Sequence, residues 1–137
     1  MEEKIRHLEM IQGVITRMAT NSFMLKGWAV TLVAGIFVLA AKDATLVYFL
    51  IAFIPIILFW FLDSYYLQLE RKYRILYKKI GKQDEPDLTF AMQPPSSCQE
   101  DKTMYLQSFL SLTECAFYGS FVILVSIAMV IISVNVL

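Results

Sequence analysis

The chain has 137 residues and a mass of 15.8 kDa, with 58% hydrophobic and 18% charged residues, no net charge and a mean hydropathy of +0.58. Soluble domains carry about 45–50% apolar and about 25% charged residues, so this composition is atypical of one. Residues 44–62 and 115–137 contain no Asp, Glu, Lys, Arg or His, which indicates a small integral membrane protein and leaves too little chain for a catalytic domain of about 100 residues.

The first 20 residues are predicted to form an amphipathic helix. Apolar side chains recur there at steps of three and four, at Ile5, Leu8, Ile11, Ile15 and Met18. We expect this helix, residues 1–20, to lie on the bilayer surface or to pack against another helix outside the bilayer. Asn21 and Ser22 are residue types that begin helices, so we expect a break where the chain enters the membrane.

Three stretches are long and apolar enough to cross a bilayer, whose core of about 30 Å needs roughly 20 helical residues. We place them at residues 22–41, 44–62 and, at the C-terminus, within 115–137. Pro55 is the only helix breaker of the second stretch. Because only Lys42 and Asp43 separate the first two stretches, we expect these to form a tight helical hairpin.

After the second span, residues 63–81 are predicted to continue the same helix. Apolar positions recur alternately four and three residues apart, at Leu62, Tyr66, Leu69, Tyr73, Leu76 and Ile80. This heptad-like seam predicts pairing with another helix, and Gly81 is typical of a helix end.

The segment 82–101 is predicted to be an acidic, proline-rich linker, because it contains three of the four prolines and five acids. From about Lys102 the spacing of Tyr105, Phe109, Leu112 and Ala116 predicts a helix. No proline or glycine interrupts it before the third span. We therefore expect residues 102–137 to form a helix that leads into that span.

The distribution of Lys and Arg predicts the orientation of these spans. Four bases precede the apolar core of the first span and seven lie between the second and third, whereas the hairpin tip has one, Lys42. The positive-inside rule then places the N-terminus and the central segment in the cytoplasm, and the C-terminus outside.

Residue types that carry catalysis or bind metals form no recognisable pattern. Cys98 and Cys115 lack metal-ligand spacing, and the single histidine, His7, lies among charged residues near the N-terminus. We find no nucleophile motif, phosphate-binding loop or paired carboxylates on one helix face. We therefore expect a protein that is not an enzyme and has no metal or cofactor.

Lys26 and Asp63 stand at the predicted cytoplasmic ends of the first two spans. A lone charge at the centre of a membrane helix costs roughly 2.5–3.5 kcal/mol, so burial of either residue favours pairing, within a subunit or between subunits. In the alternative, Lys26 extends to the headgroups and Asp63 only flanks its span. Glu114, at the inner edge of the third span, is a third such residue and could line a cytoplasmic vestibule.

Small residues form two stripes: Gly27, Thr31 and Gly35 in the first span, and Gly119, Ser126 and Ser133 in the third. Such stripes let helices pack closely. Alternatively, the serine face lines a narrow aqueous path in an oligomer, since three spans of one chain cannot enclose a pore. The candidate pore or gate residues are Lys26, Asp63, Asn21, Ser126 and Ser133.

Basic side chains crowd the helix that follows the second span: Arg71, Lys72, Arg74, Lys78 and Lys79, with Tyr73 and Tyr77 between them. As a positive-inside flank, they would attract anionic lipid at about 1 kcal/mol per residue. Alternatively, basic and aromatic side chains in combination bind single-stranded nucleic acid or nucleotides. These seven residues are the candidate ligand-binding set.

Three stretches resemble a family of small bacterial membrane proteins: RMATNSFMLKGW over 17–28, AAKD over 40–43, and LD-x-YY-x-x-x-ER-x-x-R-x-LY over 62–77. By function, the family that the chain resembles best is the membrane effector of Hailong-type antiphage defence. The resemblance covers roughly residues 5–80. It implies an oligomeric channel, a tetramer, in the bacterial inner membrane, held shut by DNA oligomers that a nucleotidyltransferase-like partner makes.

Together these observations predict an all-α integral membrane protein with three transmembrane helices, an N-terminal amphipathic helix and a cytoplasmic helical extension. We expect a homo-oligomeric ion channel controlled by a cytoplasmic anionic ligand, either a short single-stranded DNA or a nucleotide. The alternative is a noncatalytic membrane anchor that recruits a cytoplasmic partner through residues 64–113.

Overall fold

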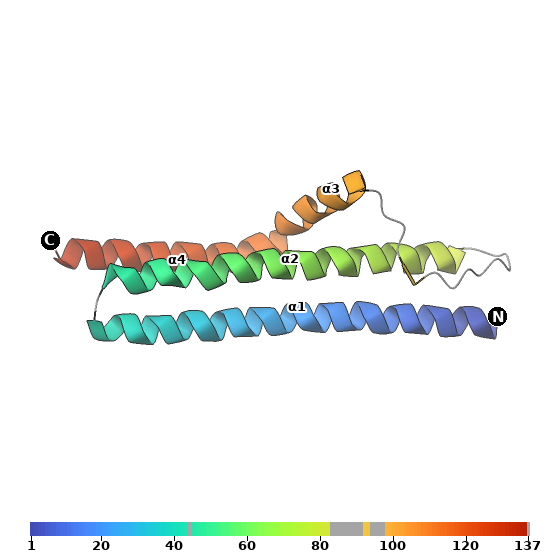
Figure 1. The fold of residues 1–137 in the computed structure, drawn as a ribbon, viewed down its shortest axis with the longest axis horizontal. Helices are drawn as coiled ribbons and strands as arrows, with labels where there is room; N and C mark the ends of the chain where they lie inside the picture. Colours follow the sequence, from blue (N-terminus) through green and yellow to red (C-terminus); the bar gives the residue numbers. More distant parts are fainter. Residues whose placement is uncertain (44, 83–91, 94–97, 137) are drawn as a thin grey trace.

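The computed structural model describes residues 1–43, 45–82, 92–93 and 98–136. This part of the chain forms helices α1 (Glu2–Asp43), α2 (Leu46–Lys82), α3 (Cys98–Phe109) and α4 (Leu112–Val136), and contains no strand (Figure 1). Three of these helices, α1, α2 and α4, are long and apolar enough to cross a membrane. The predicted all-helical class with three candidate spans is confirmed.

Helix α1 is uninterrupted over 42 residues, which makes it about 63 Å long at 1.5 Å per residue. The break that we expected at Asn21 and Ser22 is therefore wrong, and the predicted segments 1–20 and 22–41 are parts of one helix. No Gly or Pro lies between Val14 and Lys26 to interrupt the backbone. The hydroxyl of Ser22 donates to Asp63 of α2 instead of capping a new helix.

The turn between α1 and α2 confirms the predicted tight hairpin. Helix α1 ends at Asp43 and α2 begins at Leu46, and the hydroxyl of Tyr48 donates to Asp43 Oδ2 at 3.3 Å. Helix α2 runs for 37 residues through Pro55 and ends at Lys82. The predicted continuation of the second span over residues 63–81 is thus confirmed, and α1 and α2 lie side by side along their whole length (Figure 1).

Residues 2–21 of α1 and 64–82 of α2 form a two-helix pair, which we call the stalk. Its core contains Ile11, Ile15, Leu76 and Ile80, with Leu8 and Tyr73 packed against them. At the open end of the stalk, Lys4 Nζ donates to the carbonyl oxygen of Gly81 at 3.3 Å. Of the two alternatives for the N-terminal helix, the structure shows packing against another helix.

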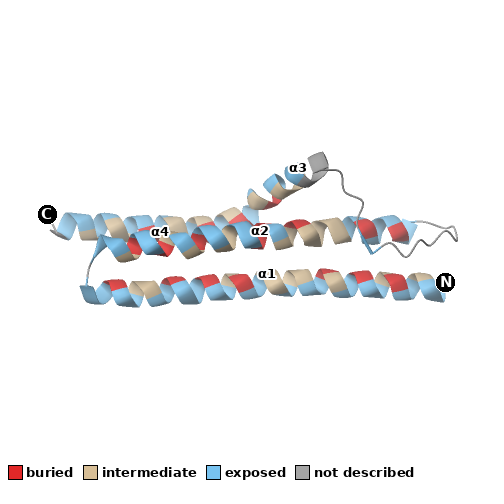
Figure 2. Ribbon diagram, in the orientation of Figure 1, coloured by how far each residue is buried: buried red, intermediate tan, exposed pale blue. Residues whose placement is uncertain are grey.

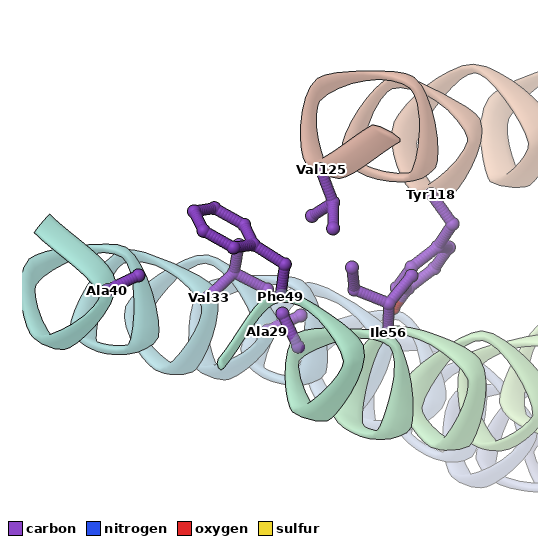
Figure 3. Packing of buried hydrophobic residues seen from close by; sticks show 8 residues of the cluster. Ala29, Val33, Ala40, Phe49, Ile56, Tyr118 and Val125 are labelled. Carbon is purple, nitrogen blue, oxygen red and sulfur yellow. The ribbon is translucent and has the colours of Figure 1, made fainter. Parts of the chain in front are cut away.

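The other half of the molecule is a three-helix apolar layer with α2 in the middle. Buried side chains from α1, α2 and α4 form its core: Ala29, Val33, Ala40, Phe49, Ala52, Ile56, Tyr118 and Val125. Figure 3 shows Val125 and Tyr118 of α4 pointing toward α2, where Phe49 and Ile56 lie. In the described residues the backbone of α4 lies close to the backbones of α2 and α3 but not to that of α1. In this part of the chain, side chains alone connect α4 to α1. Much of each helix surface is exposed (Figure 2). The exposed residues of this layer include large apolar ones, for example Val38, Leu58 and Val130. Exposed apolar faces of this extent indicate contact with lipid or with other chains.

Helices α3 and α4 are separate, so the single helix expected over residues 102–137 is wrong. The chain turns at Leu110 and Ser111, and Ser111 Oγ accepts the backbone N–H of Glu114 at 3.4 Å. Ser-x-x-Glu is a capping-box pattern, which favours a new helix start over continuation of the preceding helix.

Two side-chain hydrogen bonds hold α3 against α2. Trp60 Nε1 donates to the carbonyl oxygen of Phe109 at 3.2 Å, and the Tyr105 hydroxyl donates to the carbonyl oxygen of Phe61 at 3.0 Å. Partial burial raises the pKa of the Tyr105 phenol above its ordinary value. Beyond these contacts, α3 leans away from α2 and α4 (Figure 1).

Most of the predicted linker 82–101 lies outside the described residues. Its last four positions, from Cys98, are the first turn of α3. The helix after the linker therefore begins four residues earlier than the expected Lys102.

Candidate functional site

Three charged side chains from three helices meet in the interior of the protein. Lys26 of α1 forms ion pairs with Asp63 of α2 and with Glu114 of α4, and its Nζ lies 2.9 Å from Glu114 Oε1. The exposed fractions of these side chains are 17% for Lys26, 0% for Asp63 and 2% for Glu114. We call Lys26, Asp63, Glu114 and the two hydroxyl residues that bond to them, Ser22 and Tyr118, the Lys26 cluster.

The charged groups of Lys26 and Asp63 each take part in three side-chain hydrogen bonds. The ammonium of Lys26 has three donors, and it donates to Ser22 Oγ at 3.1 Å, to Asp63 and to Glu114. Asp63 also accepts the hydroxyl of Ser22 and, at 2.9 Å, that of Tyr118. Such saturation is what buried charges require, because an unpaired one loses its hydration without compensation.

The cluster lies at one boundary of the apolar layer. Along α1 from Lys26 to Asp43, and along α2 from Leu46 to Asp63, the chain rises roughly 25 Å at 1.5 Å per residue. That distance is close to the hydrocarbon thickness of a bilayer, about 30 Å. The Lys26 cluster therefore stands where the candidate spans meet the base of the stalk.

Aromatic rings surround the cluster at this level. Lys26 Nζ lies 5.8 Å and 6.0 Å from the ring centroids of Phe117 and Tyr118, within the range of cation–π attraction. The ring of Trp60 stacks on Tyr118 and, on the α3 side, on Phe109. Aromatic side chains are typical of the boundary between hydrocarbon and water.

The structure joins two of the five candidate pore or gate residues. Lys26 and Asp63 pair within one chain, which is the first of the two alternatives that the sequence left open. Asn21 is half-buried on α1 and takes no part in the hydrogen bonds of the cluster. Ser126 and Ser133 are exposed on α4, and Ser126 Oγ donates to the carbonyl oxygen of Val122 at 2.7 Å.

The small-residue stripe of α1 faces outward. Gly27, Thr31 and Gly35 are exposed, and a Cβ added at either glycine would meet no atom within 4 Å. Thr31 Oγ1 donates to the carbonyl oxygen of Gly27 at 2.9 Å. This stripe therefore packs no helix of the same chain and is open to a neighbouring molecule.

The candidate ligand-binding residues do not form one uniform face. Arg74, Tyr77, Lys78 and Lys79 are exposed, whereas Arg71 and Lys72 are half-buried. Arg74 donates through Nε and Nη2 to Glu70 Oε1, at 2.9 Å and 2.7 Å. Tyr73 is half-buried and packs against the core of the stalk, whereas Tyr77 is exposed; their role as stacking surfaces stays a prediction.

Sequence reasoning missed Ser22 and Tyr118 as members of the cluster. Each is four residues from a charged member, Ser22 before Lys26 and Tyr118 after Glu114, and so shares its helix face. A hydroxyl residue four positions from a charged residue in an apolar segment is the sequence signal that could have identified both.

The fold and the cluster together define a helical protein with three candidate membrane spans joined by buried charges. Among the described residues, no group of three or more His, Cys, Asp or Glu side chains could hold a metal ion. Comparison of the chain with protein-family models, with curated proteins and with solved structures gives no match.

Proposed function

We propose that the protein is a homo-oligomeric ion channel of the bacterial inner membrane, controlled from the cytoplasm by an anionic ligand. The observation that carries the proposal is the Lys26 cluster at the base of the stalk. Charged residues are expensive in a bilayer, and those found there commonly belong to ion pathways or switches. The cluster ties together α1, α2 and α4 of one chain, so a shift of any of these helices relative to the others has to rearrange its bonds.

The geometry of one chain supports the proposed assembly into an oligomer. The three candidate spans of one chain, α1, α2 and α4, enclose no pore. A closed ring of equivalent chains can enclose one. The outward stripe at Gly27, Thr31 and Gly35 supports close approach of a second chain, and the exposed Ser126 and Ser133 suit a wall of an aqueous path. The resemblance to the Hailong effector suggests a tetramer.

Control by a ligand is supported by the continuity of α2. Arg71 lies about two turns beyond Asp63 on the same unbroken helix, roughly 12 Å away. A polyanion bound at the exposed Arg74 and Lys78 would restrain the helix that holds Asp63 in the cluster. In the antiphage role that the resemblance implies, this ligand is a short single-stranded DNA or a nucleotide made by a nucleotidyltransferase partner.

A noncatalytic membrane anchor is the second candidate. Leu106 on α3, Leu110 in the turn after it and Leu112 at the start of α4 are 58%, 60% and 87% exposed. These side chains lie close to the boundary at which the cluster stands, where a cytoplasmic partner could bind. An anchor of this kind would assemble with its partner but conduct no ions.

Ion flux from liposomes that contain the purified protein separates the two candidates. For the parent protein we expect ion flux that short single-stranded DNA suppresses. For the Arg71→Ala/Arg74→Ala variant we expect ion flux that the same DNA does not suppress. Lys42→Ala, which removes a base at the opposite end of the helices, is the matched control and should behave as the parent. Intact oligomers that give no flux in any condition would support the anchor instead.

A further inference from the structure

The charges of the Lys26 cluster do not balance. Asp63 and Glu114 are both buried and share one partner, the ammonium of Lys26. In the described part of the chain, no other cation is seen in contact with either carboxylate. With all three groups ionised, the interior would hold one uncompensated negative charge beside the apolar core.

The hydrogen bonds show which carboxylate lacks compensation. Asp63 accepts bonds from Lys26, Ser22 and Tyr118, whereas Glu114 accepts one bond, at Oε1. Glu114 Oε2 is buried and has no hydrogen-bond partner among the described residues. The three donors of Lys26 are already engaged, so none remains for this oxygen.

We propose that the Lys26 cluster is a proton-binding site and that Glu114 Oε2 is the atom that binds the proton. One O–H bond forms at Glu114 and no bond breaks, while Lys26 stays an ammonium and Asp63 a carboxylate. The bound proton removes the excess charge and turns the unpartnered oxygen into a donor. Asp63 contacts the same ammonium as Glu114, so its carboxylate is the neighbouring acceptor for this new bond.

The groups that face Glu114 from the neighbouring helices agree with this assignment. Lys26 from α1 and Asp63 from α2 are the charged ones, and Tyr118 on α4 turns its hydroxyl to Asp63. On the α3 side, Tyr105 is bonded to the Phe61 carbonyl oxygen. Two carboxylates that share one site favour binding of a proton by one of them, and Glu114 is the one with fewer donors.

A proton-binding site makes stability depend on pH. An unfolded Glu side chain has lost its proton above about pH 5, so above that pH the folded chain would hold one proton more than the unfolded chain. Stability then falls as the pH rises, by up to about tenfold in the folding equilibrium constant per pH unit while the site stays occupied. Proton binding at Glu114 is independent of whether the protein conducts ions.

The first experiment measures the proton by infrared spectroscopy of the full chain in lipid bilayers at neutral pH. We expect a carbonyl band of a neutral carboxylic acid that Glu114→Gln removes. Glu70→Gln, which changes the partner of Arg74 on the stalk, is the matched control and should leave the band in place. Absence of the band in the parent, its persistence in Glu114→Gln, or its loss only in Asp63→Asn would overturn the assignment.

The second experiment compares unfolding in detergent at several pH values above about pH 5. Glutamine resembles the neutral acid, so Glu114→Gln should keep the parent's folding equilibrium at neutral pH within about threefold and lose the pH dependence that the parent shows. Asp63→Asn should destabilise strongly. A Glu114→Gln variant that fails to fold, or stability that follows sodium concentration at constant pH, would contradict proton binding.

Discussion

Lys26 and Glu114 lie 88 positions apart in the chain, and their side chains meet at 2.9 Å across two helices whose backbones do not approach each other. Lys26 thereby connects α1 to α4 over the central helix α2. It also pairs with Asp63 of α2, so one side chain joins all the candidate spans at one level. Displacement of any of the three helices would have to break or rearrange these bonds.

Lys26→Met tests the energetic role of this junction. The substitution leaves Asp63 buried without its cation, and removal of one partner from a buried ion pair costs about 3–5 kcal/mol. We expect the free energy of unfolding in detergent to fall by this amount. Lys42→Met, at the exposed hairpin tip, serves as the control, and equal effects of the two substitutions would show that Lys26 only extends to the headgroups.

Ser111→Ala tests the break between α3 and α4. Loss of the hydroxyl that accepts the Glu114 N–H should destabilise the protein by about 1 kcal/mol. Ser120→Ala removes a hydroxyl that bonds only within its own helix turn, to the carbonyl oxygen of Phe117. Thermal unfolding that does not distinguish Ser111→Ala from Ser120→Ala would argue against the cap.

Ile15→Ala tests the packing of the stalk. Ile15 is 3% exposed in the core of the stalk, and Ile→Ala substitutions at such sites cost about 2–5 kcal/mol. Amide hydrogen exchange should become faster over the stalk segments of α1 and α2, with less change in the apolar layer. Ile5→Ala, at a position that is 50% exposed, is the control and should leave exchange nearly unchanged.

Gly35→Leu tests whether the outward stripe of α1 is an interface between chains. Gly35 is exposed and a Cβ added there meets open space in one protomer, and leucine favours helix more than glycine by about 1 kcal/mol, so the protomer should stay folded. We expect the mass of the detergent-solubilised oligomer to fall. Gly13→Leu, a helical glycine with equally free space in the stalk, is the matched control, and an unchanged mass in Gly35→Leu would place the interface elsewhere.

The periodic features of the sequence predicted the larger part of the architecture. The seam that includes Leu76 and Ile80 correctly predicted a helix continuing past the second span, because its side chains pack in the stalk. The burial cost of a charge likewise pointed to the pairing of Lys26 with Asp63. These inferences depend on the spacing of apolar residues and on the cost of a charge in an apolar segment. Both can be judged from the sequence alone.

Features decided by contacts between distant segments were not predictable in the same way. Ser22 was interpreted as the start of a helix, but its hydroxyl is occupied by Asp63, 41 positions away. The turn at Ser111 was hidden because Phe109, Leu112 and Ala116 keep helical spacing across it. Glu114 reaches Lys26, which belongs to another candidate span, only because α4 packs against α2.

Recording of currents from the purified oligomer in a planar lipid bilayer tests the central claim most directly. A channel built from equivalent chains around one path predicts discrete current steps, which protein-free bilayers lack and which short single-stranded DNA on the stalk side suppresses. Oligomers that insert stably into the bilayer and never give such steps would contradict the proposal and leave the membrane anchor as the better account.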